Sequence, residues 1–173
     1  MYYVRKFSKP TSVNKLRALS DVNDLESDFL SQELRTSGNT LSFWKCEGPE
    51  QLEDTVNTIL LSTNKIETSQ FIMIDESYLT ESRIEIDHTK PGKTGYKNHA
   101  DLHVDFCCLT YQKIGEIVGI LKKVAASEDK MPKYERGKIK EILCRLHKDG
   151  LIDLDNTDEH LRSDIIKYSQ QTA

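Results

Sequence analysis

The sequence lacks any long apolar run. Its longest apolar stretch, residues 114–121, contains two glycines and a glutamate and is far shorter than the about 20 residues of a membrane-spanning helix. Residues 1–17 contain no apolar core of the kind found in secretory signal peptides. We therefore expect a cytoplasmic protein that contacts no membrane and keeps its four cysteines as reduced thiols.

Signatures of catalysis are also missing. No Gly-x-Ser-x-Gly motif is present to expose a hydrolase serine, and no His-Glu-x-x-His motif is present to bind zinc. Gly92-Lys93-Thr94 has the tail of a phosphate-binding loop, but position 87, where that loop needs a glycine, is an aspartate. We interpret this segment as an ordinary flexible loop. An enzyme is the less favoured hypothesis, although a dispersed active site would leave no such signature.

Charge is distributed in blocks, although the net charge is only −4. Residues 1–19 contain five basic and no acidic groups, whereas residues 20–34 contain five acidic and no basic ones. Residues 130–148 are again basic, and residues 149–164 are acidic. Such blocks either pair within the fold or face a charged partner, and internal pairing is the more ordinary outcome. The net negative charge gives no case for nucleic-acid binding.

The first half of the chain predicts both strands and helices. Alternating or continuous apolar residues between turn signals predict strands over four segments: 2–7, 40–46, 71–75 and 83–87. Helical spacing predicts one helix after Ser20 and another after Pro49, and residues 11–19 are expected to form a loop. The expected fold is therefore α+β, with a small mixed sheet of three to four strands and two helices over residues 1–87.

The second half predicts helices alone. Residues 88–98 are polar and contain two glycines and a proline, which indicates a flexible loop. An apolar stripe predicts a long helix from His99 to about Ala126, and similar stripes predict helices over 130–147 and after Asn156. Gly150 is expected to end the helix over 130–147 in a left-handed conformation. We therefore expect an all-helical C-terminal subdomain over residues 99–173.

One set of metal-ligating residues follows from the predicted long helix. His99, His103 and Cys107 are four residues apart, so they share one side of a helix, and imidazole and thiolate are zinc ligands. However, three such positions on a straight helix seldom converge on one ion. Packing at the end of the apolar stripe is the alternative. A metal-dependent enzyme that uses His99 and His103 is therefore a second functional hypothesis.

Gly115 and Gly119 are the small residues of the same predicted helix. Glycine costs about 1 kcal/mol in a helix interior, so two of them at this spacing indicate close contact with another helix. That contact is either packing within the chain or a homodimer interface.

The favoured hypothesis is a non-catalytic protein-interaction module. It would act through charged surface patches, as an antitoxin or immunity protein, an inhibitor or an adaptor would. A DNA-binding regulator that uses the basic helix 130–148 is another alternative. The acidic residues over 149–164 would repel a phosphate backbone, so this alternative is less favoured.

Overall fold

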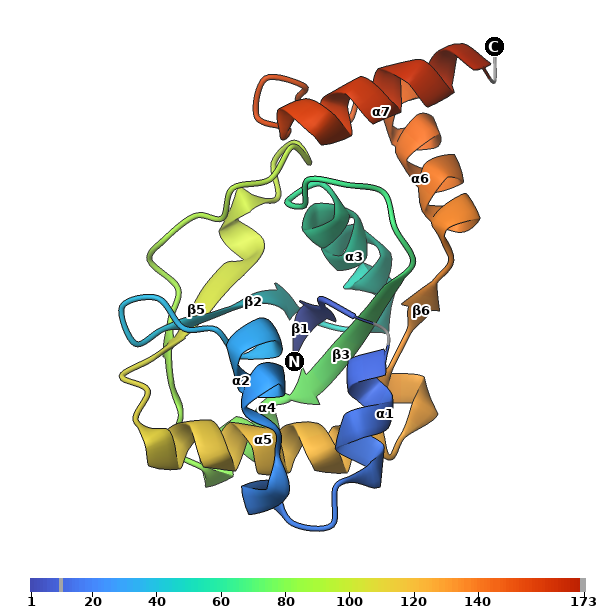
Figure 1. Ribbon diagram of the computed structural model, residues 1–173. Helices are drawn as coiled ribbons and strands as arrows, with labels where there is room; N and C mark the ends of the chain where they lie inside the picture. Colours follow the sequence, from blue (N-terminus) through green and yellow to red (C-terminus); the bar gives the residue numbers. More distant parts are fainter. Residues whose placement is uncertain (10, 172–173) are drawn as a thin grey trace.

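The computed structural model describes residues 1–9 and 11–171, so Pro10 and the last two residues of the predicted helical region lie outside it. The described residues form six strands and seven α-helices, as Figure 1 shows. The strands are β1 (Tyr2–Phe7), β2 (Leu41–Cys46), β3 (Ser69–Asp75), β4 (Glu85–Asp87), β5 (His103–Cys107) and β6 (Lys133–Tyr134). The helices are α1 (Thr11–Ala18), α2 (Ser27–Glu33), α3 (Leu52–Leu60), α4 (Glu76–Glu81), α5 (Tyr111–Ala125), α6 (Arg136–Lys148) and α7 (Glu159–Gln171).

The strands form one sheet in the order β4-β5-β2-β1-β3-β6, and every pair of neighbours is antiparallel. The small mixed sheet of three to four strands with two helices is therefore wrong. Strand direction and order depend on contacts between distant segments, and periodicity along the chain carries no information about them.

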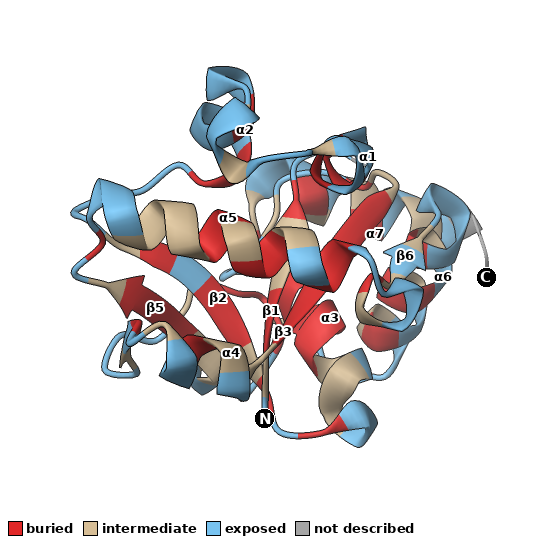
Figure 2. Ribbon diagram, turned by 90° about the horizontal axis from the view of Figure 1, so that it is seen from below, coloured by how far each residue is buried: buried red, intermediate tan, exposed pale blue. Residues whose placement is uncertain are grey.

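Helices cover both faces of this sheet and produce three layers (Figures 1 and 2). One core lies between the sheet and α1, α2, α4 and α5, and it includes Tyr3, Phe7 and Phe43. The other core lies between the sheet and α3, α6 and α7, and it includes Val4 and Trp44. Successive side chains of a strand point to opposite faces, so β1 and β2 contribute to both cores.

The prediction of an all-helical region from His99 is wrong at β5. Val104 and Phe106 are fully buried in the first core, while His103, Asp105 and Cys107 alternate with them. A spacing of four residues keeps side chains on one face of a strand as well as of a helix, because four is a multiple of the strand period of two. The row of His99, His103 and Cys107 therefore could not distinguish the two structures.

Other local predictions have mixed outcomes. The first four predicted strands agree with β1 to β4 within about two residues. Residues 11–19 were expected to form a loop, but Thr11–Ala18 form α1. The single helix expected after Ser20 is divided between a 3-10 turn and α2. Gly150 ends α6 with φ +69°, as expected of a helix-terminating glycine. None of the helices in the described residues is both long and apolar enough to cross a membrane.

The connecting segment, residues 88–98, lies between α3 and the residues that precede α7. The Gly95 N–H donates to the carbonyl of Leu61 (3.1 Å), and the Gly95 carbonyl accepts from the Asp153 N–H (2.8 Å). A Cβ at Gly95 would lie 2.0 Å from the Thr157 hydroxyl oxygen, so only glycine fits this close approach. These bonds hold the middle of the segment, and its flexibility in solution stays a prediction.

Candidate functional site

A cleft of about 500 Å³ lies on the face of the sheet that carries α3. Two other cavities measure about 280 and 260 Å³. Five separate segments of the chain line the cleft: β1 with the residue after it, β2, the C-terminal end of α3 with the loop after it, the connecting segment, and the residues before α7. The polar lining consists of Arg5, Lys6, Ser8, Ser42, Ser62, Thr63, Asn64, Lys65, Glu67, Lys93, Asn156 and Asp158.

The cleft opens where the two central strands diverge. β1 and β2 pair only from Tyr2 opposite Cys46 to Val4 opposite Trp44. Beyond that point β1 continues along β3 as far as Phe7, while β2 pairs with β5. The second half of β1 therefore has no partner on its β2 side, and its backbone groups need another source of hydrogen bonds.

Arg5 occupies the gap between the diverging strands. Its Nε and Nη2 donate to the carbonyl of Glu33 (3.2 and 2.9 Å), and its Nη1 donates to the carbonyl of Ser42. Burial lowers the pKa of Arg5 to about 10, while the nearby Glu33 carboxylate opposes this shift. A guanidinium has five N–H donors, so two remain for a ligand after these three bonds.

The carboxylate of Glu33 is engaged elsewhere. Glu33 is 1% exposed, and its two oxygens accept from the N–H groups of Ser8 (2.6 Å) and Lys9 (3.2 Å) and from the Ser12 hydroxyl. Within the described ranges, Arg5 consequently forms no direct ion pair with a carboxylate. Its charge faces carbonyl oxygens and contributes positive potential to the cleft.

Three lysines add to this positive charge. Lys6 and Lys65 both contact Glu67, at 2.9 and 2.8 Å. Burial raises the pKa of Glu67, but hydrogen bonds from the two lysines outweigh it and lower that pKa overall. Lys93 is exposed and has no hydrogen bond or ion pair with any described residue. Four cations thus face two carboxylates, those of Glu67 and Asp158, and the lining has a net charge of +2.

Trp44 forms part of the apolar wall of the cleft. It is 7% exposed, yet its indole N–H donates no hydrogen bond to any of the residues described. The connecting segment covers the ring at Gly92, where a Cβ would lie 2.3 Å from a ring carbon. The His103 ring meets Trp44 edge-on, with 5.2 Å between the ring centroids. Trp44 is therefore a closely packed wall residue whose indole N–H has no hydrogen-bond acceptor among the described residues.

Ser42, Asp105 and His103 form a polar row beside the cleft. The Ser42 hydroxyl donates to Oδ1 of Asp105 (2.8 Å), and Nε2 of His103 lies 3.7 Å from the same oxygen. Nδ1 of His103 lies 2.9 Å from the carbonyl of Lys90. The carboxylate, and not the imidazole, contacts the serine, so the row lacks the serine–histidine contact that activates a nucleophile.

The structure does not bring the three predicted metal ligands together. His99 precedes the 3-10 turn Ala100–Leu102, where its ring stacks on Tyr96 with 4.2 Å between centroids. His103 and Cys107 are the two ends of β5, and four residues of strand span about 13 Å. Neither histidine belongs to a group of three potential ligands within the described part of the chain.

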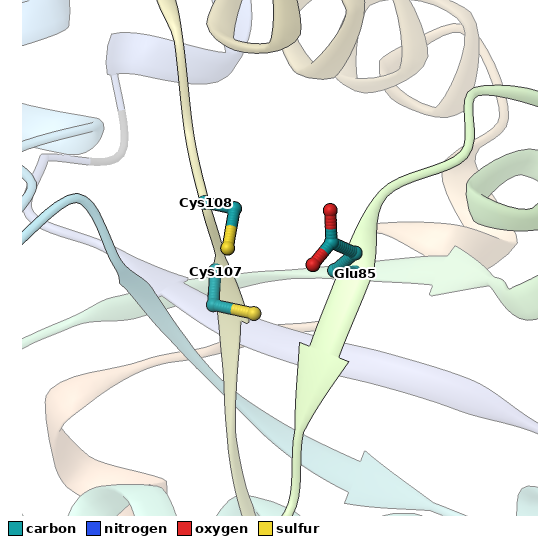
Figure 3. A group of neighbouring side chains, drawn as sticks. All are labelled: Glu85, Cys107 and Cys108. Atoms are coloured by element: carbon teal, nitrogen blue, oxygen red, sulfur yellow. The ribbon is translucent and has the colours of Figure 1, made fainter.

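Cys107 instead lies beside Cys108 and Glu85 (Figure 3). One potential ligand atom from each residue lies within 4.8 Å of the other two. Hydrogen bonds with Glu85 first, and with Cys107 second, raise the pKa of the Cys108 thiol. On the helix predicted from His99, adjacent cysteines would point to different sides. The doublet was the sequence signal for this cluster, but Glu85 could be added only from the strand pairing.

The charged blocks pair partly with the rest of the fold. Lys15 of the first basic block contacts Glu26 of the first acidic block at 2.5 Å. Arg145 of the basic helix forms an ion pair with Glu53 on α3. These contacts occupy charges on which an interaction surface would depend, although exposed pairs of this kind are weak.

No family model, curated protein or solved structure matches this chain. A functional inference must therefore come from the residues of the chain itself. Lys93 belongs to Gly92-Lys93-Thr94, which was interpreted as an ordinary loop because the first glycine of a phosphate-binding loop is missing at position 87. The fold nevertheless places Lys93 on the cleft, together with cations that are distant in sequence.

Proposed function

We propose that the protein binds a small phosphate-bearing molecule in the cleft beside β1 and β2. The observation that carries this proposal is the net charge of +2 on the cleft lining, in a chain whose overall charge is −4. Positive groups that gather in a concave site attract anions more strongly than the same groups on a flat surface. The charge is therefore concentrated where a ligand can be enclosed.

The available donors suit phosphate. Arg5 has two N–H groups to offer, and guanidinium forks match the oxygens of phosphate and carboxylate groups. Lys93 adds a mobile ammonium group. A volume of about 500 Å³ lies within the usual range for small-molecule sites, about 300–1,000 Å³, and accommodates more than inorganic phosphate alone.

The proposal assigns no reaction to the cleft. The serine beside it contacts a carboxylate and not a histidine, which supports a binding role. A reducing, cytoplasmic location belongs to the same proposal, and the four free cysteines are compatible with it. The earlier hypotheses of a protein-interaction module and of DNA binding through α6 stay predictions, and the cleft lends no specific support to either.

Trp44 provides the test, because it is the only tryptophan of the chain and it lines the cleft. Its fluorescence is recorded during titration with inorganic phosphate, pyrophosphate and ATP at low salt. We expect a saturable change in emission, tighter binding for the polyphosphates, and weaker binding as salt screens the charges. Polyglutamate of similar charge tests whether any polyanion suffices.

Lys93→Ala is the informative variant, because this side chain contacts no described partner and its loss should leave the fold intact. We expect polyphosphate binding to weaken about tenfold, which corresponds to about 1.4 kcal/mol. Lys123→Ala removes an exposed lysine from α5, on the other face of the sheet, and serves as the matched control. Equal effects of the two variants, or stronger binding of polyglutamate than of polyphosphate, would contradict the proposal.

A further inference from the structure

A second candidate site lies at the edge of the sheet, away from the residues that line the cleft. β4 is the edge strand, and it pairs with β5 so that Glu85 lies opposite Cys107. Cys108 follows directly after the end of β5. The close-up in Figure 3 shows both cysteines on one strand end and Glu85 on the strand beside it.

The backbone at Cys108 brings the two sulfur atoms together. Neighbouring side chains of a regular strand point to opposite faces, which would separate adjacent cysteines. Cys108 has φ +55°, a left-handed conformation that residues with a Cβ rarely adopt. The next residue holds this conformation in place, because the Leu109 N–H donates to the carbonyl of Asn39 (3.1 Å) and Leu109 is only 7% exposed.

The three ligand atoms have the separations of a metal site. Two zinc–sulfur bonds of about 2.3 Å at a tetrahedral angle place the sulfurs about 3.8 Å apart. The potential ligand atoms of Glu85, Cys107 and Cys108 all lie within 4.8 Å of one another, so small side-chain rotations suffice. One Glu85 oxygen contacts the Lys113 ammonium (3.1 Å), which orients the carboxylate and leaves its second oxygen for an ion.

The geometry points to Glu85, Cys107 and Cys108 as a site for a thiophilic divalent cation such as zinc. Two thiolates and one carboxylate form a ligand set that zinc and cadmium accept, whereas calcium and magnesium require oxygen ligands. Cys108 and Glu85 are exposed, so an ion can enter from solvent, and its fourth position faces water. Three protein ligands with one open position are typical of exchangeable or catalytic zinc.

The test uses full-length protein without a polyhistidine tag, kept reduced by a phosphine. Cadmium is titrated while thiolate-to-metal charge-transfer absorption is recorded, and zinc is then added as a competitor. We expect one cadmium per chain and its displacement by zinc. The Cys107→Ser/Cys108→Ser variant should lose the absorption and bind at least 100-fold more weakly, and Glu85→Gln should bind about tenfold more weakly.

Cys144→Ser is the matched control, because Cys144 is a partly buried free cysteine on α6 and lies outside the cluster. It should bind cadmium as the unmodified protein does. Unchanged binding in the double variant, or loss of binding in Cys144→Ser, would overturn the proposal. Melting curves in chelator establish that each variant is folded. Phosphate titration of Trp44 provides an independent readout, since the cleft does not share these ligands.

Discussion

Tyr96 anchors the connecting segment that borders the cleft, and its phenol makes this anchor dependent on pH. The side chain is 6% exposed, and its hydroxyl donates to Oδ1 of Asp54 on α3 (2.8 Å). Burial, followed by the hydrogen bond to Asp54 and the charge of that carboxylate, raises the pKa of Tyr96 to about 12. The neutral phenol is thus stabilised in the folded state.

The sign of the effect follows from proton binding. Unfolded Tyr96 loses its proton near pH 10, whereas folded Tyr96 keeps it until about pH 12. The contribution to the free energy of unfolding is fully present below pH 10 and is lost between pH 10 and 12. The gap between these two pKa values corresponds to a contribution of about 3 kcal/mol to the free energy of unfolding.

Tyr96→Phe isolates this contribution. At pH 8 the variant lacks a hydrogen bond to a charged group, so its free energy of unfolding should be lower by about 1.5–3 kcal/mol. As the pH rises from 10 to 12, only the unmodified protein loses the stabilisation from the neutral phenol, so the difference between the two free energies should shrink by about 3 kcal/mol. Urea unfolding followed by circular dichroism at closely spaced pH values measures both quantities.

The matched control is Tyr111→Phe, which removes a hydroxyl from a side chain that is 99% exposed. Its free energy of unfolding should equal that of the unmodified protein at each pH. A Tyr96→Phe difference that stays constant from pH 9 to 12 would refute the reasoning. So would equal stabilities at pH 8, because the bond to Asp54 would then contribute nothing.

Two further substitutions test the packing around α5 and the role of the buried Glu33 carboxylate. Gly115→Ala should raise the free energy of unfolding by about 0.5–1 kcal/mol, because alanine favours the helix and no heavy atom lies within 4 Å of the added Cβ. Urea unfolding measures this change. A loss of stability would indicate that the predicted dimer uses this surface. Glu33→Ala should lower the free energy of unfolding by about 3 kcal/mol, because it leaves the Ser8 and Lys9 N–H groups without their acceptor. An unchanged melting temperature would show that this carboxylate does not stabilise the fold as their acceptor.

Prediction from the sequence worked where the signal was local. In residues 40–46, alternation placed Leu41 and Phe43 on one side, and both are buried in the first core. The predictions for α1 and β5 were wrong because the pattern of apolar residues in each was ambiguous. α1 contributes only Val13 and Leu16 as buried apolar residues, which is too short a pattern to distinguish from a loop. At β5, a spacing of four suited both a helix and a strand.

The candidate sites were less predictable than the strands, because each combines residues that are distant in sequence. Lys93 was assessed only against a local phosphate-loop motif, whereas its partners on the cleft include Arg5 and Lys65. Cys107 was predicted to bind a metal together with His99 and His103 along one helix, and the structure places it beside other residues. Its actual neighbour Glu85 lies 22 positions earlier and comes close through strand pairing.

The sequence by itself determined the first four strands and the end of α6 at Gly150. It also indicated that no helix among residues 1–9 and 11–171 is long and apolar enough to cross a membrane. Each depends on residue type and spacing within about one element. The tertiary structure alone decided the antiparallel strand order, the divergence of β1 from β2 and the conformation of Cys108. These features depend on which distant segments bury their apolar faces together, and local periodicity is the same for many such pairings.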